Sequence, residues 1–165
     1  MLGKLVLGMV LVVGGVVAYE HSKRIDESQV RAHMEASLAA TRTFDSSFVC
    51  DAMAHDFSLH MIEHVADPGA RIATLREDGC RNVREAFSIM RSLSERTGGL
   101  LALDLSYEIT RIDIAPGGRH AMVETTSTVK LGPRLLMRTR SKERLSTWLW
   151  RVRSHGGEGQ SWTYL

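Results

Sequence analysis

The last third of the chain, residues 100–165, alternates apolar and polar side chains in a way that is typical of strands in a sheet with one buried face. The first of these stretches has an apolar residue at every second position: Leu101, Leu103, Leu105, Tyr107 and Ile109. After Thr110 the apolar positions change parity, to Ile112 and Ile114. One extra residue at a β-bulge produces such a change while bending the strand. We therefore expect a long strand that curls.

Three further strands should follow the first one as an antiparallel meander. The turn at 115–118, Ala-Pro-Gly-Gly, leads to a Val- and Thr-rich strand over 122–131, which Gly132-Pro133 ends. The next strand is predicted from about 135 to 152. Three glycines between 156 and 159 are predicted to form the last turn, before a final strand over 160–165.

The middle of the chain has helical periodicity. Val30, Met34 and Leu38 recur every four residues behind acidic and capping residues at 26–28, which predicts a helix to about Arg42 and a second helix over 45–55. Residues 55–63 fit either a strand or a prolonged helix. We favour a strand, paired across the turn at 67–69 with a short strand over 71–76. A third helix should run from Asp78-Gly79 to the glycine pair at 98–99.

The N-terminal 19 residues contain an uncharged apolar run of 14, Leu5–Ala18, behind Lys4. This run is short for a membrane span of about 20 residues and suits the core of a signal peptide. Both interpretations export the chain that follows, and we favour the retained transmembrane anchor. Residues 20–26 then form a charged neck, and 27–165 form one domain, since the chain of 165 residues is 44% apolar and has no repeats.

The predicted order, two helices, a short hairpin, a third helix and four strands, indicates an α+β domain in which N-terminal helices pack on a strongly curved antiparallel sheet. It resembles the nuclear transport factor 2-like fold, which ketosteroid isomerases and polyketide cyclases share. The resemblance covers about 27–165 and is carried by element order and by three aromatic and acidic stretches, at 44–57, 148–152 and 162–164. It implies a cone with one open end, which in that superfamily is an active site, a ligand pocket or a packed interior.

The resemblance also provides candidate site residues. Aromatic side chains on the inner face of the cone would line a pocket: Phe48, Trp148, Trp150, Trp162 and Tyr164. Acid–base catalysis would need a carboxyl group of raised pKa near an oxyanion-stabilising group. The candidates are Asp51, Asp56, Asp104 and Tyr107, and the alternative is that the acids are caps and solvated surface residues.

One short motif matches a metal site. His60-Met-Ile-Glu-His64 fits the inverted zincin pattern H-x-x-E-H, in which a helix presents both histidines to zinc. The segment lies beside strand-like alternation, so we favour surface or loop histidines. We expect no metal and no cofactor.

The charge is uneven although its sum is only +2: nine basic and three acidic residues give 114–165 a charge of +6, whereas 26–113 stands at −6. Five basic residues share one parity: Arg134, Arg138, Arg140, Lys142 and Arg144. On a strand they would form a ladder that contacts lipid headgroups or an acidic partner, or that only keeps a sheet face solvated.

The two cysteines, Cys50 and Cys80, lie on the second and third predicted helices. In an oxidising compartment a disulfide is expected where helix packing brings them together, and two small buried thiols are the alternative.

These features favour a non-catalytic binding or assembly subunit of an envelope complex, anchored by one N-terminal helix, with its domain in the periplasm or another extracytoplasmic space. Its expected contacts are membrane lipid and protein partners, without nucleic acid, and a homodimer is a further alternative. The alternative is a small-molecule isomerase, cyclase or hydrolase that uses the cone.

Overall fold

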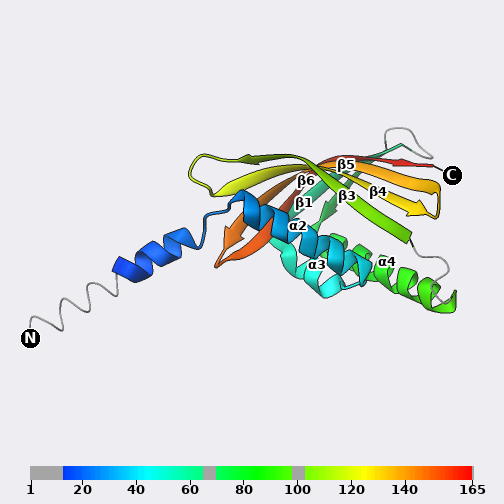
Figure 1. Ribbon diagram of the computed structural model, residues 1–165, viewed down its shortest axis with the longest axis horizontal. Helices are drawn as coiled ribbons and strands as arrows, with labels where there is room; N and C mark the ends of the chain where they lie inside the picture. Colours follow the sequence, from blue (N-terminus) through cyan, green and yellow to red (C-terminus); the bar gives the residue numbers. More distant parts are fainter. Residues whose placement is uncertain (1–12, 65–69, 98–102, 165) are drawn as a thin grey trace, which may run out of the picture.

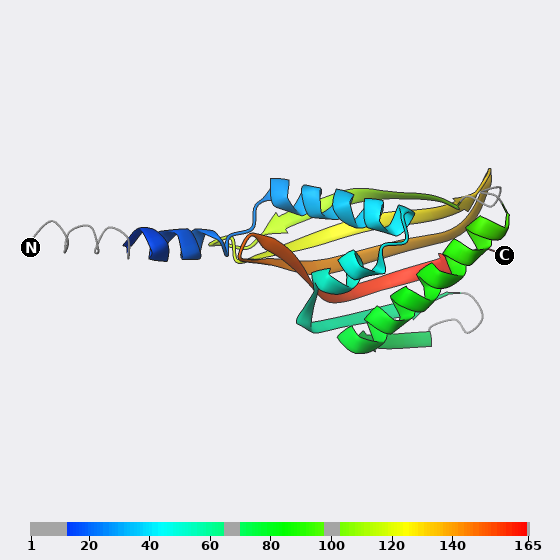
Figure 2. The same ribbon diagram turned by 90° about the horizontal axis from the view of Figure 1, so that it is seen from below.

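A computed structural model describes residues 13–64, 70–97 and 103–164. One curved sheet arches over three helices (Figures 1 and 2). The helices are α2 (Glu27–Arg42), α3 (Ser46–Ala52) and α4 (Arg76–Arg96). The strands are β1 (Met53–Glu63), β2 (Ala70–Leu75), β3 (Leu103–Ile114), β4 (His120–Leu131), β5 (Arg134–Trp148) and β6 (Arg151–Thr163), in the spatial order β2-β1-β6-β5-β4-β3.

Local signals determine where the helices begin. Asp26 and Gln29 form a reciprocal capping box at α2, and the Asp45 carboxylate accepts the amides of Ser47 and Phe48 at α3. The predicted extension of the second helix to residue 55 is wrong. The chain becomes extended at Met53, because there it pairs with β6.

The predicted sheet is confirmed in most of its parts. Strands β1 and β2 form the expected hairpin, and β3 to β6 form the expected meander. The bulge in β3 lies at Thr110, where the pairing with β4 shifts between Ile109 and Arg111. The sheet is not purely antiparallel, since β1 runs parallel to β6 and so joins the hairpin to the meander.

The last predicted turn is wrong. Strand β5 ends at Trp148, the turn is made by Leu149 and Trp150, and the three glycines lie inside β6. A Cβ atom on Gly156 or Gly157 would collide with a backbone oxygen of the neighbouring strands β1 and β5. The glycines therefore permit close strand approach, which is the other reason for glycine in a strand.

The core lies between α2 and strands β3 to β5. Ile25, Val30, Val123 and Leu145 are buried together with Ala121, and half-buried apolar side chains from α2, β3 and β6 surround them. Ile25 comes from the predicted neck. Its amide donates to the Gly118 carbonyl at 2.6 Å, so this part of the neck is packed into the domain.

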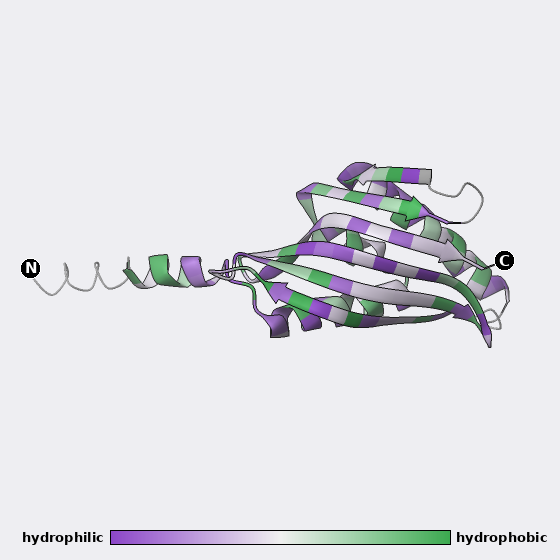
Figure 3. Ribbon diagram, turned by 90° about the horizontal axis from the view of Figure 1, so that it is seen from above, coloured by the Kyte–Doolittle hydropathy of each residue, from purple (hydrophilic) through white to green (hydrophobic). Residues whose placement is uncertain are grey.

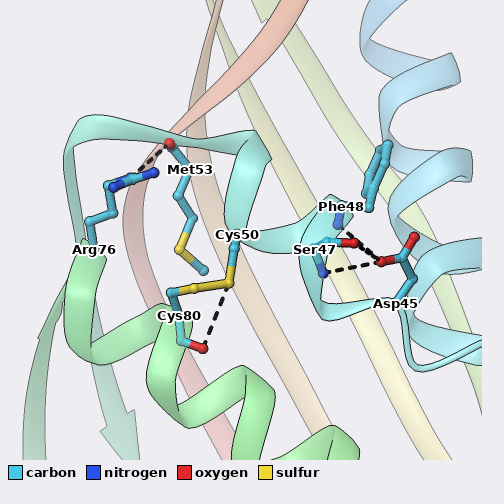
Figure 4. The surroundings of a disulfide bond; sticks show 7 residues. All are labelled: Asp45, Ser47, Phe48, Cys50, Met53, Arg76 and Cys80. Carbon is cyan, nitrogen blue, oxygen red and sulfur yellow. Dashed lines mark hydrogen bonds between the residues drawn. A yellow bond between two sulfur atoms is a disulfide. The ribbon is translucent and has the colours of Figure 1, made fainter.

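A disulfide joins Cys50 on α3 to Cys80 on α4, with Cα atoms 5.2 Å apart (Figure 4). Next to it, Arg76 Nε donates to the Met53 carbonyl at 3.3 Å, which connects the start of α4 to the start of β1. Of the two alternatives that the sequence left open, the structure has the disulfide, which ties the two helices together at the same side of the sheet.

Part of the predicted anchor lies outside the described residues, which begin at Val13. Residues 13–21 are helical, and their valines are exposed. Within the part of the chain that the structure describes, no helix is both long and apolar enough to cross a membrane. The anchor over 1–19 therefore stays a prediction.

Candidate functional site

The sheet has one face without helices, which we call the open face. Side chains alternate along β4 and β5, so that Val123 and Leu145 point to the helices whereas the even-numbered residues beside them point away. Figure 3 looks onto this face, where hydrophilic positions prevail in the middle of the sheet. Residues from all six strands line a wide, shallow hollow of about 850 Å³.

Four of the five residues of the predicted basic ladder lie on the open face. Arg138, Arg140 and Lys142 line the hollow, and Arg144 continues the row beyond it. Arg134 does not belong to the row. The register between β4 and β5 shifts at Lys130, which gives β5 an extra residue and places Arg134 out of step with the others.

The ladder is partly neutralised by neighbouring acids. Lys142 Nζ lies 3.5 Å from Glu124 Oε1, and an Arg144 nitrogen lies 3.3 Å from Asp56 Oδ2. Arg138 and Arg140 form no ion pair with any residue that the structure describes. The Arg140 guanidinium instead lies 6.0 Å from the centre of the Trp162 ring. Together with Arg71 on β2, which also lines the hollow and forms no ion pair with a described residue, these two arginines are the cations that the hollow offers to a ligand.

The aromatic wall of the hollow is Trp162 on β6. Its ring stacks on His64 with the centroids 5.2 Å apart and the planes 10° from parallel. A flat aromatic surface beside two arginines can hold a planar or carboxylate-bearing group from a partner chain.

The predicted aromatic pocket is wrong, because its members do not converge. Phe48 on α3 stacks near His33 with centroids 6.2 Å apart, whereas Trp162 lies in the hollow on the opposite face of the sheet. Trp148 and Trp150 lie at the exposed end of the β5–β6 hairpin, and Tyr164 is exposed after β6. The misplaced last turn caused the error, since it put 148–152 in one strand.

The four acid–base candidates do not converge either. Asp51 is exposed on α3, and Asp104 is exposed on β3. Burial, and then the charge of Glu35, raises the pKa of Tyr107, which lies half-buried elsewhere on β3. Asp56 lies on β1, where it pairs with Arg144. No dyad forms among them.

The zinc pattern lacks the helix that its chemistry requires. His60 and His64 lie on and just after strand β1, where four residues span about 13 Å, too far for two ligands of one ion. His60 Nε2 is instead 3.2 Å from Ser58 Oγ. Among the described residues, no three His, Cys, Asp or Glu side chains come together as a metal site would need.

Sequence reasoning missed a chain of polar side chains beyond the hollow. Asp56 Oδ1 lies 2.5 Å from His155 Nδ1, and His155 Nε2 lies 2.7 Å from Ser146 Oγ. Burial raises the pKa of Asp56, but the hydrogen bond and charge of His155, with the charge of Arg144, outweigh it and lower that pKa. The three residues come from β1, β5 and β6, so no sequence spacing could have revealed them.

The side chains of Asp56, His155 and Ser146 follow the order found in serine hydrolases, which is acid, histidine and hydroxyl. Acyl transfer also needs donors aimed at a developing oxyanion. Ser146 is a strand residue opposite Arg153 and His120 in the sheet, and the amides of paired strands are engaged in the ladder. The arrangement therefore accounts for a hydrogen-bonded tie between β1, β5 and β6 better than for a nucleophile.

A second missed residue is Glu143, on the helix-covered face of β5. Ser154 donates a hydrogen bond to its carboxyl group, which lowers the pKa of Glu143, but burial outweighs this and raises that pKa. The sequence carried only a weak signal, because Glu143 shares its parity with the apolar Leu145 but also with the polar Ser141. A carboxyl group with a raised pKa is the kind of group that acid–base catalysis requires.

Neither a family model nor a curated protein matches the chain. Solved structures do match. A protein of unknown function from Pseudomonas putida KT2440 superposes with a TM-score of 0.54 at 10% identity, over 81% of this chain and 84% of that one. A protein of unknown function from Shewanella baltica OS155 gives 0.54 at 10% identity, over 83% and 97%. Both are described as NTF2-like. This chain has the NTF2-like fold.

A third solved structure superposes equally well without specifying a function. It is a putative calcium/calmodulin-dependent protein kinase type II association domain from Thiobacillus denitrificans ATCC 25259, with a TM-score of 0.53 at 11% identity, over 82% of this chain and 94% of that one. At identities of 10–11% these proteins share only the fold with this chain. A shared fold does not imply a shared function, which depends on the side chains of the site.

Proposed function

We propose that this NTF2-like protein is a non-catalytic binding or assembly subunit of an envelope complex, anchored to a membrane by residues 1–19. Its domain would lie outside the cytoplasm and would engage a protein partner through the hollow of the open face. The observation that carries the proposal is the pair Arg138 and Arg140, two cations that form no ion pair with any described residue, beside the flat ring of Trp162.

The disulfide supports the location. Bridged cysteines persist in oxidising compartments and are rare in the cytosol. Cys50 and Cys80 are the only cysteines of the chain, and they are bridged. An oxidising compartment also agrees with the apolar, exporting N-terminal segment.

The proposed partner is an acidic segment of another protein. Arginine pairs are suited to carboxylates, which they bind through parallel hydrogen bonds. The hollow also contains glutamates at 108, 124 and 158, so its net charge is small and a polyanion such as nucleic acid is disfavoured. A second copy of the chain, as a homodimer across the open face, is the remaining protein partner.

Charge reversal tests the proposal. Replacing Arg138→Glu together with Arg140→Glu in the full chain should weaken partner co-purification from solubilised membranes by roughly tenfold or more, because each change turns an attraction into a repulsion. The wild-type complex should also weaken as salt rises, since exposed charges are screened over about 8 Å at physiological salt.

The matched control is Arg84→Glu with Arg96→Glu, two exposed arginines on α4 at the helical side of the molecule. Circular dichroism confirms that both double variants are folded. Equal partner recovery from the two would contradict a role for the open face.

A small-molecule isomerase, cyclase or hydrolase is the second candidate function, and Glu143 is the observation in its favour. Its carboxyl group lies on the helix-covered face, the inside of the cone, with a raised pKa. Binding of a small ligand that Glu143→Gln abolishes, without loss of folding, would favour this candidate over the assembly subunit.

A further inference from the structure

The turn between β5 and β6 has a composition that the fold does not require. Leu149 and Trp150 both have positive φ, 48° and 66°, the conformation of the two central residues of a type I′ turn. Asn and Gly are the usual residues there, because β-branched and bulky side chains are unfavourable at positive φ. The chain thus places two large apolar side chains where its own backbone disfavours them.

These side chains do not serve the core. Trp148, Leu149 and Trp150 are 50%, 52% and 57% exposed, and together they form what we call the hairpin tip. Contiguous exposed apolar side chains of this size mark a contact surface. Their neighbours in the structure indicate what this surface contacts.

The hairpin tip lies against the end of the N-terminal helical segment (Figures 1 and 2). The Trp148 and Tyr19 rings are 6.0 Å apart, edge to face, and the Trp150 and His21 rings are 5.6 Å apart. The Trp150 amide donates to the Ser22 carbonyl at 3.2 Å. The apolar run of the sequence ends at Ala18, immediately before this contact.

Cations surround the same place. Lys23 Nζ lies 3.8 Å from the centre of the Tyr19 ring and 5.5 Å from that of Trp148. Arg24, Arg119 and Arg151 are exposed nearby, on the neck, on the β3–β4 turn and at the start of β6. Trp and Tyr beside Lys and Arg, at the end of an apolar segment, is the composition of side chains at a membrane–water interface.

We infer that the hairpin tip docks into the headgroup region of the same membrane that residues 1–19 enter. The aromatic rings of Trp148, Trp150 and Tyr19 then lie at the interface, where Arg24 and Arg151 face lipid phosphates. Lys23 and Arg119 each lie 3.6 Å from a carboxylate oxygen of Glu20, which partly neutralises them. This second contact holds the domain in one orientation, with the β5–β6 hairpin toward the membrane. The inference rests on the proposed anchoring, and the tip is an addition to it.

The three tryptophans of the chain make the test direct, because Trp162 lies in the hollow, away from the tip. The full chain is reconstituted in vesicles of phosphatidylethanolamine and phosphatidylglycerol, with or without brominated acyl chains that quench tryptophan emission. Trp162→Phe reports on the tip alone, and Trp148→Phe with Trp150→Phe is the matched control that reports on Trp162 alone. The first should lose about half of its emission to brominated lipid, as interfacial rings lie near the upper acyl chains, and the second should keep its emission.

Each outcome decides a different question. A chain that floats with the vesicles but whose tip is not quenched overturns the docking and leaves the anchor standing. A chain that does not float overturns both. A blue-shifted, unquenched tip shows that another protein copy covers it, which also overturns the inference.

The wild-type chain provides a second measurement that needs no substitution. With 5-fluorotryptophan in place of tryptophan, spin-labelled lipid should broaden two of the three fluorine resonances. Equal broadening of all three, or of none, contradicts the docking.

Discussion

At the scale of single residues, two carboxyl groups on β1 and β5, the strands on either side of β6, experience opposite environments. Asp56 on the open face has a lowered pKa, since the imidazole of His155 and the guanidinium of Arg144 favour its charged form. Glu143 on the helix-covered face has a raised pKa, since burial penalises its charge more than the hydrogen bond from Ser154 favours it. The two groups therefore make the stability of the domain depend on pH in opposite directions.

The contribution of Glu143 can be isolated by Glu143→Gln. A raised pKa in the folded state means that the stability linked to Glu143 is complete below the ordinary value of 4.5 and is lost as the pH rises through the folded-state pKa. The variant should thus be more stable than the wild type at pH 7 and similar to it at pH 4. Urea unfolding of both proteins at the two pH values measures the difference.

The control is Glu124→Gln, which removes an exposed partner of Lys142 and should change the free energy of unfolding by less than about 1 kcal/mol at either pH. Asp56 titrates in all of these proteins and cancels from the comparison. A Glu143→Gln variant that is less stable at pH 7 would mean that the charged carboxylate stabilises the fold.

At the scale of elements, the helical layer depends on a covalent link. Helix α3 has only seven residues, too few to be stable alone, and its buried residue is the bridged Cys50. The tie at Cys80 fixes α3 on α4, and α3 continues directly into β1. Loss of this link would therefore also loosen the packing of β1 and β2, at that edge of the sheet.

We expect Cys50→Ala with Cys80→Ala to lower the free energy of unfolding by about 3–4 kcal/mol, the chain-entropy value for a closed loop of about 30 residues. Denaturant unfolding measures the loss, and reduction of the wild type should reproduce it. Two free thiols in the unreduced, alkylated wild type, detected by mass spectrometry, would contradict the bridge itself.

At the scale of the whole molecule, the N-terminal helical segment and the hairpin tip lie at the same end of the long axis. The helical segment 13–21 extends from one end of the domain, and the β5–β6 hairpin ends beside it (Figure 2). The open face runs along the sheet from that end, with the basic row on β5. If the long axis of the anchored domain stands upright on the membrane, the open face would stand upright as well, and its hollow would open to the side.

The anchor itself is tested on the membrane fraction. We expect the mature chain to begin at or near Met1, because the uncharged run of Leu5–Ala18 is extended by Leu2, Gly3 and Tyr19 toward the length of a span. N-terminal sequencing decides between the alternatives. A chain that begins at Tyr19 would identify a cleaved signal peptide, and the docking of the hairpin tip, which rests on the anchor, would lose its basis.

Sequence alone determined most of the elements, because their signals are local. The capping residues before α2, the period of 3.6 in α4, the period of two in β3 and β4, and the parity change at Thr110 each depend on neighbours in the chain. From the order of these elements the NTF2-like fold followed. The pairing of Cys50 with Cys80 followed as a hypothesis from helix placement.

The tertiary structure decided what depends on distant partners. Glycines in β6 look like a turn in sequence, but the crowding between β1 and β5 explains them. The true turn, at Leu149-Trp150, uses residues that no turn rule would select. Because the turn lies at 149–150, Trp148 and Trp150 are exposed at the hairpin tip and do not line the cone. The hydrogen-bonded series Asp56–His155–Ser146 likewise depends on how β1, β5 and β6 are paired. Sites assembled across several strands depend on register, and register is set by long-range pairing that a single sequence does not display.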